Sequence, residues 1–210
     1  MLSLLTIFSC FLTIEAFHLS SRIRTSKSTI NMITDYPELE KVLRREYNSF
    51  FKPMEKAYYD QNVQFIDPLT NFIGIDKYAN NVDMLSGRTT LGKILFEDAN
   101  INLHNIEQLS KNQLQTRWTL KVTVKAIPWK PRAVFTGVSI YTLNIQTNKI
   151  IKQDDYWDSI NLINGKYTPV SFSLGLSDFL GQLKKEQMAE MAGIVYEIIS
   201  CIVYMMYNVY

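Results

Sequence analysis

The sequence has little of the chemistry that most metalloenzymes and thiol enzymes need. It holds two cysteines, Cys10 and Cys201, close to opposite ends of the chain, and two histidines, His18 and His104. The long middle of the chain therefore has no thiol nucleophile and no disulfide, and a zinc site of the usual nitrogen and sulfur type is excluded. We expect neither a metal nor any other cofactor.

The chain also has little excess of positive over negative charge. The formal net charge is +2 at pH 7 in 210 residues, and the sequence pI is about 8.4, which gives no reason to expect nucleic-acid binding. We find no glycine-rich phosphate loop, no Ser-His-Asp order, no internal repeat and no low-complexity stretch. With 47% hydrophobic residues, the chain fits one ordinary globular domain with segments attached at its ends.

The first 31 residues are predicted to be an address that is removed. Residues 1–17 form an apolar run that ends at Ala16-Phe17, where the small alanine offers a cleavage point. Residues 18–29 are rich in hydroxyl groups, basic and free of acids, which is typical of a transit peptide. This order resembles the two-part plastid address of algae with complex plastids. We therefore expect a signal plus transit peptide over residues 1–31 and a plastid location, with secretion as the alternative.

The next part of the chain has the apolar spacing of helices. Residues 35–51 carry apolar side chains three and four residues apart, Pro53 interrupts them, and residues 54–59 form a second short helical piece. A short strand over residues 63–66 then runs into a sharp turn at Asp67-Pro68. A further helix is predicted from residue 75 to residue 85, with Gly87 ending it.

After this helix, apolar residues alternate with polar ones, as in strands. The clearest run, residues 114–125, places Trp118 on an apolar face and Arg117, Lys121 and Lys125 on a wet face, which we interpret as a solvated or dimer-forming sheet surface. Similar strands are predicted over residues 95–104, 133–144 and 150–158. Residues 32–165 are thus predicted to form an α+β domain, with N-terminal helices packed on a curved antiparallel sheet.

The C-terminal extension, residues 166–210, has a weaker pattern. We expect it to be extended near residue 167, helical from residue 177 and apolar from Met188 onward. Three alternatives stay open for the apolar tail: a membrane span, a helix packed on the domain or on a partner, and a poorly ordered end.

Several separated motifs resemble a known superfamily. A strand running into Phe65-x-Asp67-Pro68, followed by the Gly-Ile-Asp-x-Tyr motif of residues 74–78, resembles the nuclear-transport-factor-2-like (SnoaL-like) superfamily. That resemblance implies a cone-shaped α+β fold, one that also hosts polyketide cyclases and ketosteroid isomerases. More narrowly, motifs at residues 117–118, 128–132, 136–141 and 155–158 resemble a plant and algal domain of unknown function. Its members are mostly plastid proteins, and in some plants it precedes a SOUL-type haem-binding domain. We do not extend haem binding to this chain.

One carboxylate is a candidate base. Asp155 shares its strand face with Ile151 and Trp157, so it is predicted to point inward. A desolvated carboxylate has a raised pKa and can move a proton, as in the isomerase and cyclase relatives that the resemblance implies. The alternative is a buried ion pair between Asp155 and Arg117 or Arg132.

A ligand pocket is the other candidate feature, because folds of this class hold an apolar pocket between sheet and helices. The residues that could line it, or simply belong to the core, are Tyr59, Tyr78, Trp118, Trp129 and Trp157. Asp67 either faces the pocket or shapes the turn before Pro68. His104 is predicted to lie on a solvated strand face.

These observations favour a non-catalytic module that binds a small apolar molecule or another protein. The alternatives are an isomerase-like or cyclase-like enzyme, with Asp155 as base and Tyr59 or Tyr78 as hydrogen-bond donor, and a scaffold that dimerises through its sheet.

Overall fold

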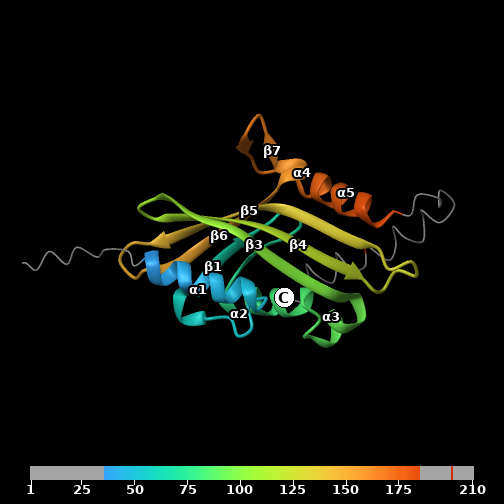
Figure 1. Ribbon diagram of the computed structural model, residues 1–210, viewed down its shortest axis with the longest axis horizontal. Helices are drawn as coiled ribbons and strands as arrows, with labels where there is room; N and C mark the ends of the chain where they lie inside the picture. Colours follow the sequence, from blue (N-terminus) through green and yellow to red (C-terminus); the bar gives the residue numbers. More distant parts are fainter. Residues whose placement is uncertain (1–35, 185–199, 201–210) are drawn as a thin grey trace, which may run out of the picture. The chain divides into compact units, whose positions relative to one another are not determined.

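A computed structural model of the chain describes residues 36–184 and residue 200 (Figure 1). Its helices are α1 (Tyr36–Asn48), α2 (Ile75–Leu85), α3 (Thr90–Leu95), α4 (Asp158–Asn161) and α5 (Phe172–Leu183), with a three-ten turn, η1, at Lys56–Tyr58. Its strands are β1 (Tyr59–Ile66), β2 (Asn71–Ile73), β3 (Phe96–Ser110), β4 (Gln113–Val124), β5 (Arg132–Asn144), β6 (Lys149–Trp157), β7 (Leu162–Ile163) and β8 (Lys166–Tyr167).

The first helix forms where its apolar spacing predicts it. Buried residues of α1, among them Leu39, Leu43 and Tyr47, recur at intervals of three and four, and Glu38 lies in the first turn, where its charge suits the helix dipole. The helix ends at Asn48, before the predicted residue 51, because Phe50 and Phe51 both have positive φ, 52° and 57°. A left-handed backbone cannot continue a right-handed helix.

Asp67 shapes the turn after β1, which was one of the two alternatives given for this residue. Asp67 Oδ1 accepts hydrogen bonds from the backbone N–H groups of Leu69, at 2.7 Å, and Thr70, at 2.6 Å. The chain then forms the short strand β2, and Gly74, with φ of 121°, leads into α2. The helical piece predicted over residues 54–59 is largely wrong, because only Lys56–Tyr58 form a turn, of three-ten type, and Tyr59 already opens β1.

The main sheet has the order β2-β1-β6-β5-β4-β3. All of its neighbouring strands are antiparallel except β1 and β6, which are parallel, so the predicted antiparallel sheet is confirmed apart from this one pair. The chain leaves β1 and β2 through α2 and α3, builds the sheet from the far edge at β3, and returns to β1 with β6. Helices α1 and α2 lie on one side of this sheet (Figure 1).

The centre of the sheet depends on one glycine. Gly137 pairs with Trp118 of β4 on one side and with Trp157 of β6 on the other. A Cβ atom at residue 137 would lie 2.0 Å from the carbonyl oxygen of Tyr156 and 3.3 Å from the Trp118 ring. A glycine inside a strand often marks such a close approach, and here no larger residue fits.

The last described helix packs beside β5. It begins at Phe172, earlier than the predicted residue 177. The Phe179 ring lies 6.0 Å from the Phe135 ring, and Gln182 Oε1 accepts a hydrogen bond of 2.6 Å from the backbone N–H of Val134. This contact falls where β5 extends beyond the end of β6, so α5 takes the place of a neighbouring strand.

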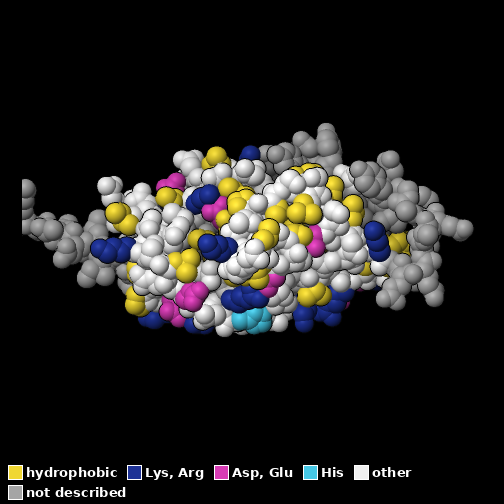
Figure 2. Space-filling model, turned by 90° about the horizontal axis from the view of Figure 1, so that it is seen from above, with side chains coloured by type: hydrophobic (Ala, Val, Ile, Leu, Met, Phe, Trp, Pro, Cys, Tyr) yellow, Lys and Arg dark blue, Asp and Glu magenta, His cyan; other side chains and the backbone are white. Residues whose placement is uncertain are grey.

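Figure 2 looks onto the side where β7, α4 and α5 lie, and hydrophobic side chains gather there between charged ones. Exposed apolar residues of these elements are Leu162, Ile163, Phe172 and Leu174. Within residues 36–184, no helix has the length and apolar character needed to cross a membrane. The predicted address over residues 1–31 and the apolar tail from Met188 lie outside the described residues.

Candidate active site

A small cavity lies between the helices α1 and α2 and the sheet. Its volume is about 70 Å³, room for about two water molecules. The wall is mostly apolar and aromatic, with residues such as Phe50, Phe51, Val82, Leu85, Ile101 and Leu120. The sheet contributes the polar residues Ser139 of β5 and Gln153 and Asp155 of β6, and α2 contributes Tyr78 and Asn81. The site is therefore a largely apolar pocket with a few polar groups.

Asp155 is the ionisable group of this wall. Protein atoms surround its carboxyl group, and the residue as a whole is half-buried and lines the cavity. Removal of water by this burial raises its pKa from 3.8 to about 7, although hydrogen bonds from Ser139 and Gln153 work in the opposite direction. At neutral pH the group is thus divided between its acid and its base form.

A glutamine holds this carboxyl group in position. Gln153 Nε2 donates to Asp155 Oδ1 at 2.8 Å, and Gln153 Oε1 accepts a short hydrogen bond from the hydroxyl of Tyr78. Because Tyr78 fixes the oxygen of the amide, its nitrogen is left to face the carboxylate. The chain of contacts runs from α2 through Gln153 to the candidate base.

The ion pair considered as the alternative for Asp155 does not form. Arg117 donates to Asp158, in a short contact, and also to Tyr167 at 2.7 Å, while Arg132 is exposed at the start of β5. Among residues 36–184, Asp155 has no ion pair with any lysine or arginine. The carboxyl group is buried without a positive partner, which is rare for an ionisable side chain.

A second group of polar side chains, joined by hydrogen bonds, lies beside the cavity. The Tyr47 hydroxyl lies 2.8 Å from Thr116 Oγ1 and 3.0 Å from the Tyr141 hydroxyl. Trp118 Nε1 donates to Ser139 Oγ at 2.8 Å. Since these buried polar atoms satisfy one another, they fix the ring of Tyr47 and the indole of Trp118 that border the cavity.

The predicted aromatic pocket residues divide into two groups. Tyr78 and Trp118 border the cavity. The other aromatic residues do not: Trp157 packs 4.4 Å from the Phe135 ring, Trp129 Nε1 donates to the carbonyl oxygen of Leu183 at 2.9 Å, and Tyr59 bonds to a glutamate of α1. Asp67 serves the turn after β1 and does not line the cavity.

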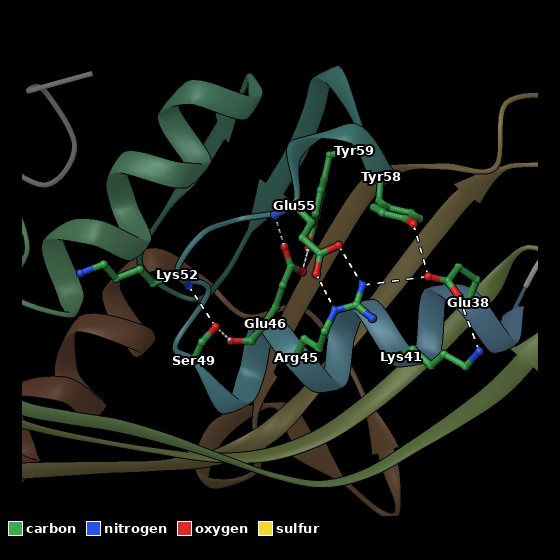
Figure 3. A network of polar contacts seen from close by, with 9 residues as sticks. All are labelled: Glu38, Lys41, Arg45, Glu46, Ser49, Lys52, Glu55, Tyr58 and Tyr59. Carbon is green, nitrogen blue, oxygen red and sulfur yellow. Dashed lines mark hydrogen bonds and ion pairs between the residues drawn. The ribbon is translucent and has the colours of Figure 1, made fainter.

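That glutamate, Glu46, is a second buried acid that the sequence analysis missed (Figure 3). Glu46 is 1% exposed; its Oε2 accepts from the Tyr59 hydroxyl at 2.6 Å and its Oε1 from the backbone N–H of Glu55 at 2.7 Å. Burial raises its pKa from 4.5 to about 7. Glu46 ties α1 to β1 and to the loop between them, while its neighbour Arg45 pairs with the Glu55 carboxylate at the surface.

The sequence does contain indications of the polar site residues that were not predicted. Glu46 follows Leu39, Val42 and Leu43 at helical spacing, so it is an acid on an apolar helix face. Ser139 likewise occupies an inward position of an otherwise apolar strand face. Gln153 carried a signal as well, because it lies between Ile151 and Asp155 on the strand face that is predicted to point inward.

The remaining polar candidates lie at the surface. His104 is exposed, and its Nε2 lies 2.8 Å from Thr119 Oγ1, as expected for a solvated strand face. The part of the chain that the structure describes contains no group of three or more His, Cys, Asp or Glu side chains able to hold a metal ion.

The fold and the site define a class: an α+β domain whose helices and curved, mostly antiparallel sheet enclose a small pocket. Solved structures that resemble it include an epoxide hydrolase/cyclase-like enzyme with a role in pyran ring formation in the polyether salinomycin, with 14% identity over 59% of this chain and 93% of that chain, at a TM-score of 0.44. An NTF2-like protein of unknown function from Cytophaga hutchinsonii has 14% identity over 57% of this chain and 96% of that chain, at a TM-score of 0.42. A SnoaL-like protein from Shewanella putrefaciens has 10% identity over 69% of this chain and 97% of that chain, at a TM-score of 0.45.

Residues 38–153 match the model of a family described as uncharacterized conserved protein (DUF2358), and the chain belongs to this family. The expectation of a domain of unknown function with NTF2-like and SnoaL-like structural neighbours is confirmed. No relative was found among curated proteins. At these identities and TM-scores the structural resemblance concerns the fold alone, so any chemistry has to be argued from this chain's own residues.

Proposed function

We propose that the domain transfers a proton to or from a small, largely apolar molecule, with Asp155 as the acid and base. One observation carries the proposal: the Asp155 carboxyl group borders an apolar cavity and has no ion pair among the described residues. The ion pair that would have given Asp155 a purely structural role does not form, because Arg117 is instead bound to Asp158.

The pKa of Asp155 suits this task. A general base works best when its pKa lies near the working pH, and burial raises the pKa of Asp155 to about 7. Gln153 and Ser139 hold the carboxyl group by hydrogen bonds, and a substrate proton would reach it from the cavity that it borders. The reaction class that fits a single carboxyl base in an apolar site is removal of a proton next to a carbonyl group.

Binding without turnover is the second candidate, and the sequence alone favoured it. Its support is the predominantly apolar wall of the cavity, which would retain a small apolar molecule whether or not Asp155 acts on it. Dimerisation through the sheet has less support, because the exposed side chains of β3 include many polar ones, such as Asn102, His104 and Glu107. Plastid delivery is also our proposal, supported by the composition of residues 1–31.

The test is catalysed hydrogen exchange on small ketones. Cyclohexanone and related cyclic ketones are incubated with the protein in deuterated buffer, and loss of the proton signal next to the carbonyl is followed by NMR. The wild type is expected to accelerate exchange, with a rate that rises through about pH 7, and Asp155→Asn is expected to lose a factor of about 10² to 10⁴. The control is Asp154→Asn, one residue away and paired with Lys152 at 2.9 Å. Equal rates in the two variants would refute proton transfer by Asp155.

A further inference from the structure

A second hollow adjoins the cavity on its outer side. This outer groove has a volume of about 300 Å³ and lies between the loop after α1 and the helix α2. Its lining includes three basic side chains, Lys52, Lys56 and Arg88, and one acid, Asp83. By contrast, the inner cavity carries no basic side chain on its wall.

One side chain belongs to both spaces. Phe51 borders the inner cavity, where Asp155 lies, and also the outer groove, where the basic side chains lie. The ring packs 5.1 Å from Tyr47 and 6.4 Å from Tyr78. An inner cavity of about 70 Å³ is well below the roughly 300–1,000 Å³ of ordinary ligand pockets, so a substrate that reaches Asp155 must also occupy space outside this cavity.

The backbone at this ring is held in a costly conformation. Phe50 and Phe51 both have a left-handed φ, which costs on the order of 1 kcal/mol or more for a bulky residue. The arrangement is fixed from outside, because Arg88 Nη2 donates to the carbonyl oxygen of Phe50 at 2.9 Å and its guanidinium lies 6.0 Å from the Phe50 ring. Arg88, a cation of the outer groove, thus fixes the backbone of Phe50, a residue that lines the inner cavity.

The charges of the groove are not all neutralised. Lys56 pairs with Asp76 at 2.6 Å, but both side chains are largely exposed, so that pair is weak. Arg88 pairs with Asp83. For Lys52, which is exposed at the groove, no ion pair exists among the described residues. The groove therefore presents an excess of positive charge next to an apolar passage.

We propose that the substrate is a small amphipathic acid, whose anionic group binds in the outer groove at Lys52, while its apolar part passes Phe51 toward Asp155. Phe51 acts as the gate between the two spaces. This inference rests on the proposed function for the reaction at Asp155, but it makes a separate claim about charge recognition.

The experiment is an NMR titration of the full chain with three eight-carbon probes: octanoate, octyl phosphate and 1-octanol. Octyl phosphate carries the same octyl chain as 1-octanol, so the difference between their Kd values measures the contribution of the charge. Octanoate, whose alkyl chain is one carbon shorter, compares a carboxylate with the phosphate. We expect the better anion to bind about threefold to fivefold more tightly than octanol, and to lose that advantage in Lys52→Gln or at raised ionic strength.

Two further variants separate this inference from the proposed function. Lys41→Gln, on the exposed face of α1 outside the groove, is expected to bind like the wild type. Asp155→Asn is expected to keep the preference for an anion, even though it loses proton exchange. Equal affinity for all three probes, or an unchanged Kd in Lys52→Gln, would overturn the inference while leaving the exchange assay to decide on Asp155.

Discussion

The buried acid Glu46 gives a sharp test of the energetics of this fold. Its pKa rises from 4.5 in the open chain to about 7 in the folded domain, so between these values the folded state binds more protons than the unfolded state. The contribution of Glu46 to stability is thus fully present below about pH 4.5 and is lost as the pH rises toward 7. A shift of this size corresponds to about 3 kcal/mol.

The perturbation is Glu46→Gln, which keeps the shape of the side chain and stays neutral. Its amide oxygen can still accept from the Glu55 N–H, and its NH₂ group can donate to the Tyr59 hydroxyl. We expect the free energy of unfolding to fall less steeply between pH 4.5 and pH 8 in the variant, by about 3 kcal/mol over that range.

Urea unfolding followed by tryptophan fluorescence measures this, since Trp118, Trp129 and Trp157 all lie within the described fold. The control is Glu40→Gln on the same helix, whose carboxylate pairs with Arg44 at the surface. If the wild type and Glu46→Gln had parallel pH profiles, the assignment of a raised pKa to Glu46 would be wrong.

Two further predictions concern the backbone. Gly137→Ala is expected to lower the free energy of unfolding by about 3 kcal/mol, because the new methyl group meets the Tyr156 carbonyl. Gly181→Ala in α5, where a Cβ meets nothing within 4 Å, should leave the free energy of unfolding unchanged or raise it by about 0.5–1 kcal/mol. Thermal melting compares the two variants. Asp67→Ala should cost about 1–2 kcal/mol through its two lost turn hydrogen bonds, and Asp67→Asn, which keeps an acceptor, should cost clearly less in the same assay.

Much of the fold could be predicted because its signals are local. The alternation in β4 correctly placed Trp118 inside and Lys121 on the opposite face. The Asp67-Pro68 turn and the glycine before α2 could be predicted equally well. The turn needs a side chain that accepts a backbone hydrogen bond, and Gly74 has a positive φ, which glycine adopts easily. The inward direction of Asp155 followed from the same period of two.

Other features depend on contacts between distant parts of the chain. The parallel pairing of β1 with β6 is decided by the whole path of the chain, and no short pattern in either strand indicates it. The position of Trp129 under the end of α5 depends on a helix far along the sequence. The cavity volume, and the role of Phe51 between two spaces, follow from side-chain packing and not from spacing.

The position of α5 beside β5 has a consequence for solubility. Where β6 ends, the backbone N–H of Val134 would face solvent as an unpaired edge, and such edges recruit strands from other chains. Gln182 occupies this N–H with a side-chain oxygen, and Phe179 covers the adjacent Phe135 ring. The helix is therefore a guard against edge-to-edge aggregation: a chain shortened before Phe172 would keep its sheet but expose a hydrogen-bonding edge with an aromatic surface beside it.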